Sequence, residues 1–194
     1  MTHSTQIQTT DLRQAVNLLL TENQQVLAKV DLDPLRQLSQ IIISSDRLRI
    51  FIAGEGRSGL SIQMAAMRLM HLGLDVHVVG EVTAPSIESR DLLITCSGSG
   101  TTHGIVDIAQ TAQKIGTKIV AITTERDSPL GKLADLVVQI EAATKQRSDL
   151  SSQQFAGSLF EQSTLLLFDA LFYVLARHLQ QSNAVLMSRH TNLE

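Results

Sequence analysis

The stretch Asp91-Leu-Leu-Ile-Thr-Cys-Ser97-Gly98-Ser99-Gly100-Thr101-Thr102 joins a short apolar run to alternating serines and glycines and a pair of threonines. A helical pattern follows, so the stretch predicts a buried strand, a tight turn and a helix start. Glycines let the backbone approach a ligand closely, and the unpaired N–H groups at the positive end of a helix favour an anion. Because four hydroxyls lie within six residues, the turn predicts a phosphate site, and a monophosphate such as that of a sugar phosphate fits it best.

The spacing of this turn differs from the two common nucleotide-binding loops. It matches neither G-x-x-x-x-G-K-[ST] nor G-x-G-x-x-G. No lysine follows the turn to reach a second or third phosphate. The sequence therefore favours a sugar phosphate over a nucleotide.

The composition narrows the class of protein. A chain of 194 residues is long enough for one domain with a full core. Charged residues make up 18% of the chain, below the usual quarter, so we expect other subunits to cover part of the surface. The net charge of -3 and the 3% aromatic content argue against nucleic-acid binding.

The single cysteine, Cys96, excludes an internal disulfide and a cysteine-based metal site, and its place in an apolar run predicts burial. The histidines and carboxylates show no metal-ligand spacing, so we expect no metal. The N-terminus is polar, and no apolar run approaches the ~20 residues of a membrane span. We therefore expect a cytoplasmic protein with no membrane contact.

Aliphatic stretches alternate with helical patterns through the middle of the chain. Such alternation predicts an α/β fold: a three-layer sandwich around a five-stranded parallel sheet of flavodoxin-like topology. The expected strands are 48–53, 74–79, 92–96, 118–123 and 136–140. We expect one domain over 1–194, with an N-terminal helical arm over 1–46 (helices 11–30 and 33–44), the sheet core over 47–141, a loop over 142–156 and a long helix over 157–181. That last helix is apolar on nearly every face, which predicts burial at a subunit interface.

A second glycine-rich turn, Gly54-Glu-Gly-Arg57-Ser58-Gly59, follows the first expected strand. Ligands of parallel sheets bind beyond the carboxyl ends of the strands, where both turns lie. One interpretation makes Ser58 a helix cap. The alternative makes Arg57 and Ser58 a second wall of the phosphate pocket.

Three further residues allow two interpretations each. Glu161 forms a capping box with Ser158, or it is a general base facing the phosphate site. His71 lies near a helix C-terminus, which favours its charged form, or it moves protons between substrate oxygens. Asp169 lies among apolar neighbours and needs a partner, for which an interface ion pair is favoured over catalysis.

Taken together, the two turns and their flanking segments resemble the SIS (sugar isomerase) domain and, within it, the 6-phospho-3-hexuloisomerase family. The resemblance covers residues 48–194 and is carried by 54–59, 66–73, 78–81, 91–102, 130–135, 157–161 and 189–194. It implies phosphate binding by Ser58, Ser97, Ser99 and Thr102, with Glu161 as the base and His71 as its acid–base partner. It also implies a homotetramer whose sites are completed by neighbouring subunits. Glu55 and Thr101 depart from residues common in the family, alanine and glutamate, and Glu55 adds a negative charge near the pocket.

The implied reaction interconverts D-arabino-hex-3-ulose 6-phosphate and D-fructose 6-phosphate through a 2,3-enediolate. It requires no redox cofactor or metal, so the resemblance implies an enzyme without a cofactor. It belongs to the ribulose monophosphate pathway of formaldehyde fixation. Two alternatives stay open at this point. One is another SIS isomerase, acting on an arabinose or heptulose phosphate, and the other is a sugar-phosphate sensor without catalysis.

Overall fold

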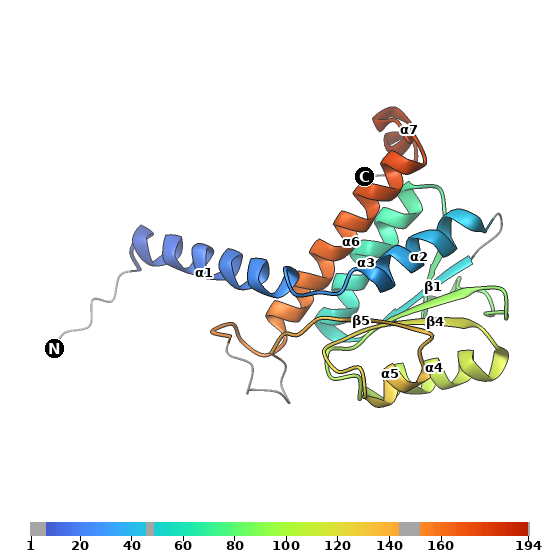
Figure 1. Cartoon of the computed structure of the whole chain (residues 1–194). Coiled ribbons are helices and arrows are strands. Elements are labelled where there is room, and N and C mark those ends of the chain that lie inside the picture. Colours follow the sequence, from blue (N-terminus) through green and yellow to red (C-terminus); the bar gives the residue numbers. More distant parts are fainter. Residues whose placement is uncertain (1–6, 46–48, 144–151, 194) are drawn as a thin grey trace.

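Five aliphatic stretches form a parallel sheet in the order β2-β1-β3-β4-β5 in the computed structural model (Figure 1). The strands are β1 Arg49–Gly54, β2 Asp75–Val78, β3 Leu92–Cys96, β4 Lys118–Thr123 and β5 Leu136–Gln139. This order is that of flavodoxin-like sheets, as predicted. Continuous aliphatic runs fix these elements because a parallel sheet is buried on both faces.

The structure describes residues 7–45, 49–143 and 152–193. Leu48, at the start of the first expected strand, lies outside these residues, as do 144–151 of the expected loop. Each strand lies within one residue of its expected bounds.

Helices cover both faces of the sheet, which confirms the three-layer arrangement (Figure 1). One face packs against α2 (Asp33–Ser44), α3 (Gly56–His71) and α6 (Ser158–His178), and the other against α4 (His103–Ile115) and α5 (Pro129–Leu133). Successive strand residues point to opposite faces. Accordingly, Ile50 and Ile52 join the first core, whereas Phe51 joins the second.

The helix α1 (Thr9–Leu27) projects from the body of the molecule (Figure 1). Its attachment lies near its C-terminal end, where the Asn23 amide donates to Gln162 and the Asn23 carbonyl accepts from the Ser163 hydroxyl of α6. Beyond that anchor, α1 exposes Leu12, Val16 and Leu20, which share one face. Among the residues that the structure describes, none covers this apolar stripe on the outer half of the arm.

The helix α6 is the element of the described chain with the length and composition of a membrane span. Half of its apolar window is buried inside the protein, however, as for the core helix of a globular protein. Leu166, Tyr173 and Val174 remain exposed on it. Periodicity did not predict the short helix α7 (Asn183–Ser188), which begins where the Ser182 hydroxyl accepts from the Val185 N–H.

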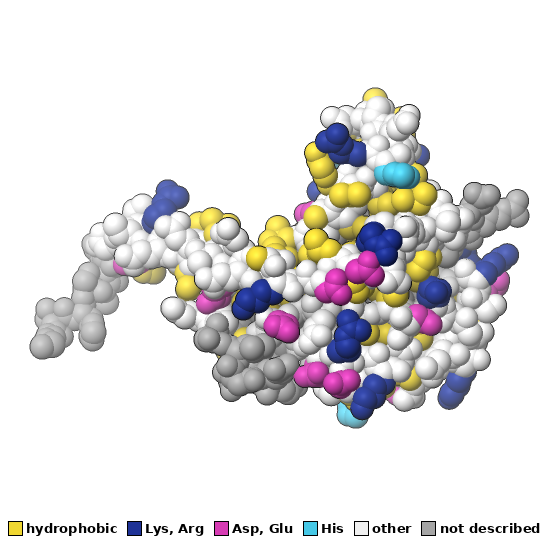
Figure 2. Space-filling model, viewed as in Figure 1, with side chains coloured by type: hydrophobic (Ala, Val, Ile, Leu, Met, Phe, Trp, Pro, Cys, Tyr) yellow, Lys and Arg dark blue, Asp and Glu magenta, His cyan; other side chains and the backbone are white. Residues whose placement is uncertain are grey.

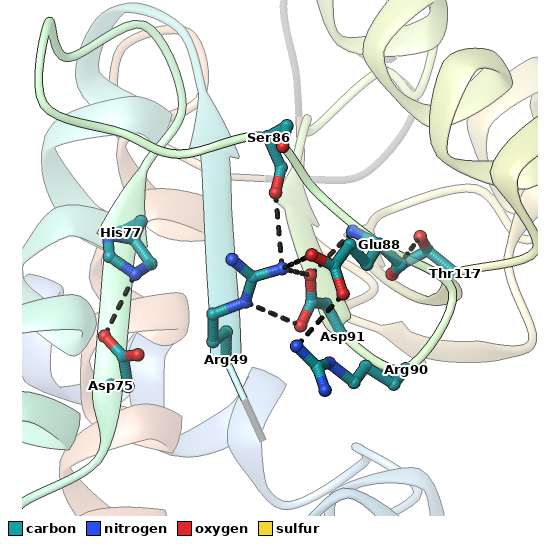
Figure 3. Close-up of polar contacts among 8 residues, drawn as sticks. All are labelled: Arg49, Asp75, His77, Ser86, Glu88, Arg90, Asp91 and Thr117. Atoms are coloured by element: carbon teal, nitrogen blue, oxygen red, sulfur yellow. Dashed lines mark hydrogen bonds and ion pairs between the residues drawn. The ribbon is translucent and has the colours of Figure 1, made fainter. Parts of the chain in front are cut away.

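A polar cluster closes the sheet at the amino ends of its strands, opposite the glycine-rich turns (Figure 3). The Arg49 guanidinium donates to both carboxylate oxygens of Asp91, at 3.0 and 2.6 Å, and the Asp91 side chain is fully buried. Asp91 also accepts from the Glu88 N–H, while the Glu88 carbonyl accepts from the Thr117 hydroxyl. These bonds fix the connection from β2 to β3, which gives the cluster a structural role.

Candidate active site

A cavity of about 240 Å³ lies at the carboxyl ends of β1 and β3. Three segments far apart in the sequence meet there: the β1–α3 turn, the β3–α4 turn and the start of α6. Its lining residues are Glu55, Gly56, Arg57, Ser58, Gly98, Ser99, Thr102, Gly157, Phe160 and Glu161. The fold therefore brings both glycine-rich turns and Glu161 to one place.

The β3–α4 turn divides its residues between the cavity and its own support. Gly98, Ser99 and Thr102 line the cavity. Ser97 is buried, and its hydroxyl pairs with that of Thr102 at 2.9 Å. The Ser99 hydroxyl accepts from both the N–H and the hydroxyl of Thr101. Ser97, Gly100 and Thr101, which the sequence placed in the phosphate site, thus lie outside the lining and hold its members in place.

Gly100 has a backbone angle that only glycine adopts readily, with φ +63°, and a Cβ there would overlap the Ser128 hydroxyl. Its carbonyl also accepts from the Leu130 N–H. We expect Gly100→Ala to lower the free energy of unfolding by about 2–4 kcal/mol, from left-handed strain plus steric overlap.

Urea denaturation measures this effect, and Gly56→Ala is the matched control. Gly56 has φ +57° with no atom within 4 Å of a Cβ, so its variant bears the strain alone, about 1 kcal/mol. An equal loss of unfolding free energy in the two variants would show that steric overlap with Ser128 adds nothing to the cost of Gly100→Ala.

Glu161 lies in the first turn of α6 with its side chain only 14% exposed. Its carboxylate accepts from the Arg57 Nε at 2.5 Å, and the Ser61 hydroxyl donates to its carbonyl. The expected capping box is wrong, because Gly157 is the helix cap and no side chain caps it. Glu161 is therefore the fourth helical residue instead of the third, too far along for the box, and its carboxylate is held over the cavity by Arg57.

Ser58 is also not a helix cap. The helix α3 begins at Gly56, after a capping Glu55, so Ser58 lies within the first turn and lines the cavity. Arg57 lines it too, but its guanidinium contacts the Glu161 carboxylate. Ser58 is thus placed for a phosphate, and Arg57 is placed beside the expected base.

Glu55 is a cavity residue that reaches across to the start of α4. A Cβ at Gly104 would overlap the Glu55 carboxylate, so this anion lies against the helix start where a phosphate is expected. Two anions at one helix start repel each other. We expect Glu55→Gln to tighten the binding of inorganic phosphate about three- to tenfold.

Dissociation constants for inorganic phosphate, measured by calorimetric titration at fixed ionic strength, test this expectation. Glu81→Gln removes the same charge away from this cavity and is the control. Weaker phosphate binding by Glu55→Gln would contradict the expected repulsion between the Glu55 carboxylate and the phosphate.

His71 lies at the other end of α3, about 20 Å from Ser58 along the helix axis. It is buried beside a separate cavity of about 280 Å³, also lined by Arg68, Phe172 and His190. Burial, together with the charges of His190 and Arg68, lowers the pKa of His71. The expectation of a favoured charge at the helix end is therefore wrong, and one chain does not bring His71 to Glu161.

The structure gives Cys96 and Asp169 structural roles. Cys96 is fully buried, which raises the pKa of its thiol to about 12 and leaves it protonated. Asp169 has its partner in the same chain, since a carboxylate oxygen lies 3.6 Å from the Arg68 Nε. In the part of the chain that the structure describes, no three His, Cys, Asp or Glu side chains are grouped as metal ligands would be.

The chain is similar to known proteins over most of its length. The family model of the SIS domain matches residues 41–172. The 3-hexulose-6-phosphate isomerase of Mycobacterium gastri is 47% identical over 185 residues, which cover 95% of this chain and 92% of that protein. The enzyme of the same name from Bacillus subtilis is 37% identical, with 91% and 95% covered.

A solved structure gives the same result. A Methanococcus jannaschii protein, whose crystal structure led to an inferred function as 3-hexulose-6-phosphate isomerase, superposes with a TM-score of 0.81 at 32% identity. The match covers 93% of this chain and 99% of that one. The chain therefore belongs to the SIS domain family and, within it, to the family of the 3-hexulose-6-phosphate isomerases.

Proposed function

We propose that this protein is an isomerase that interconverts D-arabino-hex-3-ulose 6-phosphate and D-fructose 6-phosphate in the ribulose monophosphate pathway. One observation carries the proposal: the Glu161 carboxylate stands on one wall of a cavity whose other walls hold Ser58, Ser99 and Thr102. A phosphate held by these hydroxyls leaves the sugar carbons to extend toward the carboxylate. The similarity to enzymes of this name supports the same reaction.

The chemistry needs one base and stabilisation of one oxyanion. Glu161 removes the proton from C2 of the 3-hexulose, a 2,3-enediolate forms, and the proton returns at C3. We assign stabilisation of the negative enediolate oxygen to the Arg57 guanidinium, which contacts the Glu161 carboxylate. The carbonyl only moves between adjacent carbons, so the reaction is balanced without a redox partner.

The phosphorylated 3-ketose is an open chain. Its O6 is blocked by the phosphate, and closure of O5 onto C3 would give a four-membered ring. Ring opening is therefore needed only for fructose 6-phosphate. In both directions a proton must also pass between O2 and O3, the step that we assign to His71.

We further propose a cytoplasmic homotetramer in which a neighbouring subunit supplies His71 to the site. Glu161 of α6 lies beside the start of α3, whereas His71 lies at the end of α3, so two chains are needed for these side chains to meet. Exposed apolar side chains support such an assembly, since Leu60, Met64 and Met67 share one face of α3. Figure 2 shows exposed hydrophobic side chains along α1 and on the upright part of the molecule that contains α6.

A coupled assay that detects fructose 6-phosphate formed from the 3-hexulose phosphate tests the reaction directly. Arabinose 5-phosphate, ribulose 5-phosphate and heptulose 7-phosphate are the competing substrates in the same assay. We expect the highest kcat/KM with the 3-hexulose. Tight binding of that sugar without turnover would instead identify a sugar-phosphate sensor.

A further inference from the structure

The chain after α6 folds back onto the last turn of α3, where His71 lies. The Arg189 Nη1 donates to the His71 carbonyl at 2.9 Å and to the Gln181 side chain at 3.0 Å. The His190 ring stacks on the His71 ring, with centroids 5.2 Å apart and planes 10° from parallel. Gly73 lets the tail approach this closely, because a Cβ there would lie 2.8 Å from the Arg189 guanidinium. The tail thus contacts both the backbone and the ring of His71.

Both contacts act on the protonation of the His71 imidazole. The carbonyls at a helix C-terminus normally stabilise a protonated imidazole. The Arg189 guanidinium binds the final carbonyl of α3 and offsets that negative end with its own charge. The His190 ring adds burial and, when protonated, a like charge.

The remaining charged groups around His71 come from α3 and α6. Arg68, one turn earlier on α3, lies near the imidazole and is itself 3.6 Å from Asp169 of α6. Burial is the largest influence on the pKa of His71, followed by His190 and Arg68, and all three lower it. The cavity beside the two rings leaves room for a group from outside this chain.

We propose that Arg189 and His190 are positioning residues, which hold the His71 imidazole neutral and in one orientation for proton transfer between O2 and O3. A neutral imidazole donates at one nitrogen and accepts at the other, whereas an imidazolium can only donate. The inference rests on the proposed isomerase function for the role of His71. It gives the C-terminal tail a part in the reaction that acts through His71.

The test is a titration of the His71 imidazole by NMR in the full-length protein and its variants. His190→Ala removes both stacking and charge, and we expect the pKa of His71 to rise by roughly 0.5–1 pH units. His190→Phe keeps a ring and removes the charge, so the rise is smaller. Arg189→Gln keeps a donor for the His71 carbonyl but removes the positive charge, and it also raises the pKa. His178→Ala, at an exposed position of α6, is the control and leaves it unchanged.

The pH profile of kcat/KM is the second measurement. A raised pKa means that His71 is protonated at higher pH. In each variant the acid limb of the kcat/KM profile therefore moves to higher pH by as much as the pKa of His71 rises in that variant. A folded His190→Ala protein with an unchanged His71 titration overturns the proposal, as does a moved titration with an unchanged acid limb. Full activity of His71→Ala would instead refute the proton-transfer role in the proposed function, whereas the titration alone decides whether the tail sets the protonation of His71.

Discussion

Glu161→Gln is expected to lower kcat between about 10²- and 10⁴-fold while leaving sugar-phosphate binding nearly intact. The amide has the size of the carboxylate and can still accept from Arg57, so the cavity keeps its walls. It cannot accept a carbon-bound proton, however. The substitution leaves unchanged the residues proposed to bind the phosphate, so we expect the Kd for fructose 6-phosphate to stay within about threefold.

Two measurements distinguish a role of Glu161 as the base from a purely structural role. Calorimetric titration gives the Kd, and NMR in D₂O follows deuterium entering C3 of fructose 6-phosphate, which requires removal of the C3 proton and return of a solvent deuteron to the same carbon. We expect deuterium incorporation to be lost with turnover in Glu161→Gln. Glu81→Gln, outside this cavity, serves as the control. Deuterium exchange at the wild-type rate in Glu161→Gln would show that another group is the base.

His71→Ala and Glu161→Gln are expected to be inactive separately and to restore activity when their subunits are mixed. If each site takes Glu161 from one chain and His71 from another, random mixing gives about a quarter of the sites both native side chains. The physical reason is the length of α3: Glu161 shares a cavity with Ser58 at the start of that helix, and His71 lies about 20 Å from Ser58 along the helix axis.

Coexpression or refolding of the two variants, followed by the fructose 6-phosphate assay, measures the recovery. The control mixes Glu161→Gln with a chain that carries both substitutions, since no site can then contain both native residues. Recovery in this control, or no recovery in the first mixture, would contradict the shared site.

Most of the fold could be predicted from the sequence because its signals are local. Aliphatic runs such as Leu92–Cys96 are long enough to mark buried strands, and glycines or serines mark where those strands end. The six-residue helix α7 was missed because so short an element shows no periodicity. The two cap assignments failed because helix starts are poorly marked in sequence: α6 is capped one residue before Ser158, and α3 three residues before Ser58.

The site was only partly predictable. The sequence by itself determined which segments reach the carboxyl edge of the sheet, because parallel connections leave no other place for the turns at 54–59 and 97–102. Tertiary structure decided which side chains face the cavity: Ser99 and Thr102 line it, Ser97 supports Thr102, and Arg57 turns to Glu161. It also decided that His71 pairs with the C-terminal tail instead of with Glu161. The physical reason is distance along the chain: a strand or a turn forms from neighbours in sequence, whereas the pairing of Arg57 with Glu161 and that of His71 with the tail join residues about a hundred positions apart.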